Sequence, residues 1–197
     1  MNKSTEQNNR RGFLSKMLVA GTSGVALLSS SVFAGGKSDN NSGTTELDDD
    51  QKDRLFFIYQ EEKVARDVYT YLGDLYPDES TFASIQLAEQ RHMDSAQELC
   101  ERYGIDISMI DESIYGEFFV EYLQKLYEKC IKLGKKELID ALEVGVLIEE
   151  TDIGTLTDTI DAIDVETMPA DVISTYLTLR EGSYNHLESF EARLARV

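Results

Sequence analysis

A glutamate and a histidine stand three residues apart in the segment Ala88-Glu89-Gln90-Arg91-His92-Met93, where the apolar residues follow a helical period. Side chains three residues apart on a helix leave the same face about one turn apart, so Glu89 and His92 can bind one metal ion together. The other histidine of the chain, His186, lies in the similar segment Ser183-Tyr184-Asn185-His186-Leu187. Here Ser183 takes the place of the carboxylate.

An acidic pair inside an apolar helical pattern precedes each histidine segment. The pairs are Glu61-Glu62 and Glu149-Glu150. A helix with carboxylates followed by a helix with a histidine therefore occurs twice. Four-helix bundles build dinuclear carboxylate sites from this layout, so the pattern predicts such a bundle with a metal site in its interior.

The helical period predicts which acid of each pair faces inward. Glu62 shares a stripe with Ile58 and Ala65, whereas Glu61 is rotated by roughly 100° and is predicted to face solvent. In the second pair, Glu143 and Glu150 share a face with Val146 and Leu147, which predicts that Glu149 and Asp152 face outward or toward an edge. The candidate metal ligands are therefore Glu62, Glu89, His92, Glu143, Glu150 and His186.

The composition favours one all-helical domain that positions these residues. The chain has 197 residues, of which 42% are hydrophobic, with two prolines and no tryptophan. The apolar periods predict four main helices, and the second and third run parallel because a long connection separates them. We expect the main helices at 50–72, 81–103, 136–160 and 169–195, and a short extra helix at 117–133 in the long connection.

The N-terminal residues are predicted to lie outside the folded domain. The segment Asn9-Arg10-Arg11-Gly12-Phe13-Leu14 resembles a twin-arginine export signal, and an apolar run up to Ala34 follows it. A membrane anchor is the alternative, but the run is short and rich in glycine and serine. We therefore predict a signal peptide at 1–34, a polar linker at 35–50 and the folded domain at 51–197, in a periplasmic or extracellular protein that keeps no membrane segment after cleavage.

Charge and cysteine spacing exclude several kinds of site. The formal net charge of −18 argues against binding to nucleic acid and to anionic membrane surfaces. Cys100 and Cys130 have no Cys-x-x-Cys spacing, which argues against a zinc or iron–sulfur site. Whether they form one disulfide is left open by the sequence.

The segments EEKVARDVY and AEQRHMDSA resemble the first half of the ferritin-like superfamily, with rubrerythrin as the closest well-known pattern. Together with ALEVGVLIEETDI and NHLESF, they resemble a bacterial and archaeal family of unknown function within that superfamily, over about residues 52–196. The resemblance implies a ferritin-like four-helix bundle with a di-iron site. It places Glu62, Glu89, His92, Glu150 and His186 at ligand positions, whereas Ser183 departs from the pattern. The rubredoxin-type iron–sulfur motif of rubrerythrin is missing.

The expected function is that of an exported protein that binds two iron ions, with manganese as the second choice, because carboxylates and two imidazoles suit these metals. Such a protein could be a di-iron oxidase or peroxidase acting on dioxygen or hydrogen peroxide. Two alternatives stay open: an iron storage protein with ferroxidase activity, and a structural or interaction bundle without redox chemistry. A homodimer is compatible with all three.

Overall fold

The computed structural model describes residues 46–197, which contain five α-helices and no β-strand. The all-helical prediction is confirmed, and the first helix begins two residues before the predicted domain boundary. The predicted export signal lies outside the described residues. No helix in the described part of the chain is both long and apolar enough to cross a membrane. The helices are α2 (Asp49–Leu75), α3 (Ser80–Arg102), α4 (Glu121–Gly134), α5 (Leu138–Asp161) and α6 (Ala170–Leu194).

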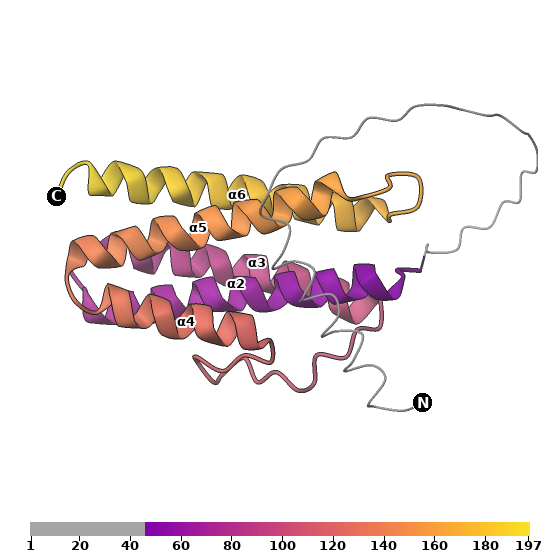
Figure 1. The fold of residues 1–197 in the computed structure, drawn as a ribbon, viewed down its shortest axis with the longest axis horizontal. Helices are drawn as coiled ribbons and strands as arrows, with labels where there is room; N and C mark the ends of the chain where they lie inside the picture. The colour runs from indigo at the N-terminus through magenta and orange to yellow at the C-terminus, as the bar shows by residue number, and fades with distance from the viewer. Residues whose placement is uncertain (1–45) are drawn as a thin grey trace, which may run out of the picture. The chain divides into compact units, whose positions relative to one another are not determined.

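The helices form two antiparallel pairs, α2 with α3 and α5 with α6 (Figure 1). The pairs touch along α2 and α5 and along α3 and α6. Helices α3 and α5 run in the same direction, so the chain returns along the length of the domain between them, and α4 lies in this return (Figure 1). The arrangement is compatible with the predicted four-helix bundle with one extra helix.

The middle of helix α2 is surrounded by protein on all sides. Every residue from Leu55 to Tyr69 is buried. Helices α3 and α5 cover one side of α2, while α4 and the preceding loop cover the other. The prediction that Glu61 faces solvent is therefore wrong, because Glu61 is 3% exposed and accepts a hydrogen bond from Thr155 of α5.

A buried ion network fastens that loop to α2. The Lys63 ammonium donates to Asp67 at 2.7 Å and to the carbonyl of Ile114 at 2.8 Å. The backbone N–H of Gly116 donates to Asp67 at 2.9 Å, and Arg66 donates to both Asp67 and the loop carbonyl of Glu112. Each buried charge thus has a charged partner and further hydrogen bonds, which buried ions require.

The two cysteines are free and buried. Cys100 lies on α3 and Cys130 on α4, and no Cα atoms of these two helices come within 8 Å of one another. A disulfide requires Cα atoms closer than about 7 Å, so the fold does not allow the bond that the sequence left open.

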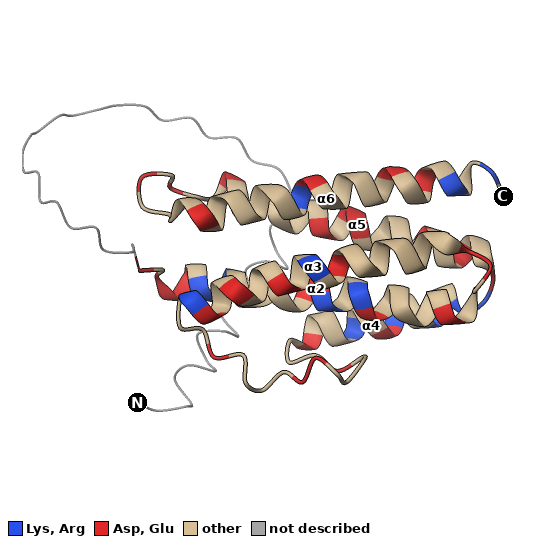
Figure 2. Ribbon diagram, turned by 180° about the vertical axis from the view of Figure 1, so that it is seen from behind, with Lys and Arg blue, Asp and Glu red and all other residues tan. Residues whose placement is uncertain are grey.

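Helix α5 contributes buried apolar residues to the second pair and contains no lysine or arginine (Figure 2). Its Gly145 lies where the ring of Phe190 on α6 approaches, since a Cβ atom there would stand 2.5 Å from the ring. The close approach fixes the rotation of α5 and hence the direction of its acidic side chains.

Gly116 is predicted to be essential for the loop, and Gly154 is a matched control. Gly116 has φ +78°, and a Cβ atom there would lie 2.7 Å from the Tyr127 ring. Gly116→Ala should therefore destabilise the fold by about 1–3 kcal/mol. Gly154, exposed on α5 with open space around it, should gain about 0.5–1 kcal/mol on replacement by alanine. Urea unfolding measures both changes, and equal effects would contradict the loop geometry.

Candidate metal centre

Four helices bring five potential ligands together in the interior. Glu62 comes from α2, Glu89 and His92 from α3, Glu149 from α5 and His186 from α6. The three glutamates are at most 1% exposed, and the side chains of His92 and His186 are 13% and 11% exposed. A buried cluster of these groups is unusual, because ionised carboxylates are costly to bury without a cation.

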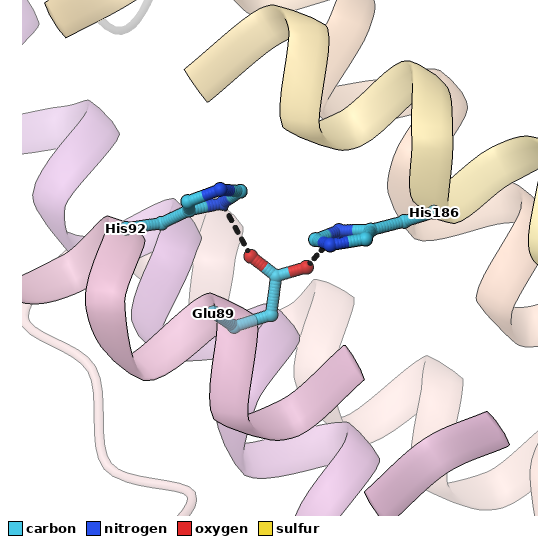
Figure 3. Close-up of side chains that lie close together, drawn as sticks. All are labelled: Glu89, His92 and His186. Carbon is cyan, nitrogen blue, oxygen red and sulfur yellow. Dashed lines mark hydrogen bonds and ion pairs between the residues drawn. The ribbon is translucent and has the colours of Figure 1, made fainter. Parts of the chain in front are cut away.

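The Glu89 carboxylate lies between the two imidazole rings (Figure 3). One of its oxygens, Oε2, is 2.9 Å from His92 Nδ1, and the other, Oε1, is 2.7 Å from His186 Nδ1. The rings are stacked, with centroids 5.3 Å apart. Each oxygen of Glu89 therefore contacts a different histidine, as the two oxygens of a carboxylate that bridges two metal ions would.

Each imidazole faces a second carboxylate from another helix. His92 Nδ1 lies 3.4 Å from Glu62 Oε2, and His186 Nδ1 lies 3.6 Å from Glu149 Oε2. The result is two half-sites that share Glu89, each with one nitrogen and one further carboxylate. Ligand atoms that bind one ion at about 2.1 Å and at a right angle lie about 3 Å apart, close to these separations.

Several of these atoms lack a hydrogen-bond partner. They are both carboxylate oxygens of Glu62, Oε1 of Glu89, Oε2 of Glu149 and Nδ1 of His186. The contact between Glu89 and His186 is short, but it lacks the direction of a hydrogen bond. Buried polar atoms are nearly always paired, so this group fits a bound cation better than a self-contained polar network.

Protonation can balance the charges when no metal is bound. Burial raises the pKa of Glu62 and of Glu149, and it acts in the same direction on Glu89, but contacts with His186 and His92 outweigh it and lower the pKa of Glu89. Burial disfavours the imidazolium form of the histidines, yet their carboxylate contacts raise the pKa of His92 to about 10 and of His186 to about 9. An imidazole nitrogen binds a metal ion only in its deprotonated form, so a metal ion would compete with protons for these rings.

The predicted inward position of Glu143 and Glu150 is wrong, because both side chains are exposed. Helix α5 instead turns Glu149 and Asp152 inward, and both are buried. The segment has apolar residues on more than one face, so its period alone did not determine the rotation. Gly145, one turn before Glu149, was the available signal for the face that contacts α6.

Two further acidic residues, missed as inward residues by the sequence analysis, adjoin the centre. Glu61 accepts a hydrogen bond from Thr155 at 3.1 Å, and Asp152 is 1% exposed. Helix α2 thus buries both acids of its pair, Glu61 and Glu62, and helix α5 buries Glu149 and Asp152.

Neighbouring hydroxyl groups orient the glutamates or turn away from them. Tyr69 donates to Glu149 Oε1 at 2.6 Å, which leaves Oε2 directed at His186. Ser183 is buried, but its hydroxyl donates to the carbonyl of Leu179 at 3.1 Å along its own helix. Ser183 therefore does not supply the carboxylate that α6 lacks, and Tyr184, 48% exposed, lies at the surface.

Ligand atoms of Glu89, His92 and His186 all lie within 4.8 Å of one another, so these three residues alone could hold one metal ion. With Glu62 and Glu149 the donor set becomes three carboxylates and two imidazoles. This mixture of oxygen and nitrogen suits iron or manganese, whereas copper(I) prefers sulfur ligands.

Gly182 on α6 is predicted to be required for the position of His92. A Cβ atom at Gly182 would stand 2.5 Å from His92 Nε2 and still closer to Cε1. Gly182→Ala should push the ring away from Glu89 and weaken Fe²⁺ binding by about tenfold or more, while far-UV circular dichroism stays helical. Gly154→Ala is the control, since it adds a methyl group in open space. Unchanged affinity in Gly182→Ala would show that His92 is not held there.

Comparison with known proteins identifies a family. The family model described as "Uncharacterized protein domain (DUF2202)" matches residues 51–196. The uncharacterized protein MJ0754 of Methanocaldococcus jannaschii is 36% identical over 144 residues, which cover 73% of this chain and 75% of that protein. The crystal structure of the hypothetical protein MJ0754 matches with a TM-score of 0.69 and 32% identity, over 85% of this chain and 86% of the other. This chain therefore belongs to the DUF2202 family.

Proposed function

We propose that the protein is a ferritin-like four-helix bundle that binds two transition-metal ions, iron first and manganese second. The observation that carries the proposal is the Glu89 carboxylate, which lies buried between two imidazole nitrogens with a further glutamate beside each. One ion would be held by Glu62, Glu89 and His92, and the other by Glu89, Glu149 and His186. The donor set and the unpartnered atoms support this assignment.

Ferrous ions bound there would supply electrons for the reduction of dioxygen or hydrogen peroxide and would themselves be oxidised to the ferric state. The chain itself holds the ligands and limits the access of water. Tyr69 keeps one oxygen of Glu149 occupied, and Gly182 leaves room for the His92 ring. The apolar residues around the carboxylates lower the local dielectric constant and so strengthen their attraction to a cation.

Two adjacent residues on α5 give a sharp test of the site. Glu149→Gln removes a buried carboxylate that faces His186, whereas Glu150→Gln removes the same charge from an exposed neighbour. We expect Fe²⁺, added anaerobically to the full chain, to shift the ring signals of both histidines in NMR spectra. Glu149→Gln should weaken the effect at His186 by tenfold or more, as roughly expected for a lost ligand, and Glu150→Gln should not.

A thermal measurement adds an independent readout. An ion at about 100 times its Kd stabilises the native state by about 2.7 kcal/mol, which raises Tm by roughly 5–10 °C for a domain of this size. Glu150→Gln should retain this shift and Glu149→Gln should lose most of it. Histidine signals and Tm that do not respond to Fe²⁺ or Mn²⁺ would refute the metal function.

Export forms a separate part of the proposal and depends on the arginine pair outside the described residues. Arg10→Lys together with Arg11→Lys should leave unprocessed precursor in the cytoplasm of a bacterium with a twin-arginine pathway. That pathway recognises the arginine side chains, and lysine does not replace them. Immunoblots of cell fractions measure the result. Normal processing of the double variant would indicate a different route.

A further inference from the structure

Tyr69 of α2 reaches across the bundle to Glu149 of α5. Its side chain is 0% exposed, and its hydroxyl donates to Glu149 Oε1 at 2.6 Å. The ring packs against Phe190 of α6 and Phe82 of α3, with centroids 5.2 and 6.3 Å away, and both phenylalanines are 0% exposed. Rings from two further helices therefore hold Tyr69, so its hydroxyl has little room to turn away from the carboxylate.

The hydrogen bond leaves Glu149 with one free oxygen. Its Oε2 has no hydrogen-bond partner and lies 3.6 Å from His186 Nδ1, whereas Oε1 is held by Tyr69. Glu62 differs, because both of its oxygens lack a hydrogen-bond partner and Oε2 lies 3.4 Å from His92 Nδ1. The two half-sites have the same types of ligand, but they differ in the number of carboxylate oxygens that are free to bind a cation.

The sequence explains why Glu62 has no such donor. Tyr69 follows Glu62 by seven residues on α2, and Leu156 follows Glu149 by seven residues on α5. Helices α2 and α5 are antiparallel neighbours (Figure 1). The position on α5 that corresponds to Tyr69 therefore carries a buried apolar side chain, and Leu156 has no hydroxyl to donate to Glu62.

We propose that Tyr69 restricts Glu149 to coordination through one oxygen, so that the metal position beside His186 keeps room for a small external ligand. Carboxylates bind metal ions through one oxygen or through both. Glu62 is free to use both, whereas the hydrogen bond directs Oε1 of Glu149 toward Tyr69. The inference rests on the proposed function and names the half-site at which dioxygen or hydrogen peroxide would bind. Tyr69 is a positioning residue, because it acts through Glu149.

Azide, a small anion that binds iron, is the probe for the external ligand. The full chain is loaded anaerobically with Fe²⁺ until the ring signals of both histidines have shifted in NMR spectra, and azide is then added. The chain has two histidines, one in each half-site, so their signals report the two positions separately. We expect azide to change the signals of His186 at lower concentrations than those of His92.

Tyr69→Phe and Tyr59→Phe are a matched pair of variants. Both tyrosines are buried on α2, and Tyr59 also donates to a glutamate at 2.6 Å, but its acceptor is Glu112 in the loop. Tyr69→Phe frees Oε1 of Glu149 to compete with azide, so the azide affinity at His186 should fall by about tenfold or more. Tyr59→Phe loses a hydrogen bond of the same length and should bind azide as the wild type does.

The contrary outcomes are distinguishable. Absence of azide binding, an equal response of both histidines to azide, or unchanged azide affinity in Tyr69→Phe would overturn the restriction of Glu149 and leave the metal function intact. Loss of the Fe²⁺ shift at His186 in Tyr69→Phe, with helical circular dichroism retained, would also overturn it, because the hydrogen bond would then be needed to bind the ion itself. If neither histidine of the wild type responds to Fe²⁺, the proposed function itself fails.

Discussion

The need to balance buried negative charge governs the interior of this domain. Five of its buried carboxylates, those of Glu61, Glu62, Glu89, Glu149 and Asp152, have no lysine or arginine partner among the described residues, and ionised carboxylates persist in such surroundings only opposite cations. Glu89 is the centre of this balance, because its two oxygens face the two imidazoles. Protons on the rings can stabilise Glu89 when no metal is bound. The carboxylates of Glu62 and Glu149, at 3.4 and 3.6 Å from the rings, are then left protonated or underpaired.

Within seven residues, helix α2 contains buried charged groups that are fully paired and others that are not. Lys63, Arg66 and Asp67 form ion pairs with each other, and their remaining hydrogen bonds go to the loop. This network is complete and needs no ligand. Glu61 and Glu62 are equally buried, but both oxygens of Glu62 lack hydrogen-bond partners. The contrast separates charges that hold the loop from carboxylate oxygens without hydrogen-bond partners, although the sequence alone does not distinguish the two kinds of buried charge.

The sequence predicted the helices, Glu62, and the pairing of Glu89 with His92 because each depends on local spacing. His186 could be found because it is the other histidine in a comparable segment. Glu149 could not be distinguished from Glu150, since the rotation of α5 depends on the contact between Gly145 and Phe190 of another helix. The burial of Glu61 was missed for a related reason. The period of α2 implied that Glu61 faces solvent, but Thr155 of α5, distant in sequence, donates a hydrogen bond to it.

The two sides of the interior differ in ligand chemistry. Helices α3 and α6 contribute both imidazoles, whereas α2 and α5 contribute Glu61, Glu62, Glu149 and Asp152. The histidine side chains retain 13% and 11% exposure, while the carboxylates of α2 and α5 are at most 3% exposed. The histidines are therefore the most exposed of the side chains that make up the cluster. Ser183 on α6 is neutral and Asp152 on α5 is acidic, so apart from Glu89 the buried carboxylates of the cluster come from α2 and α5.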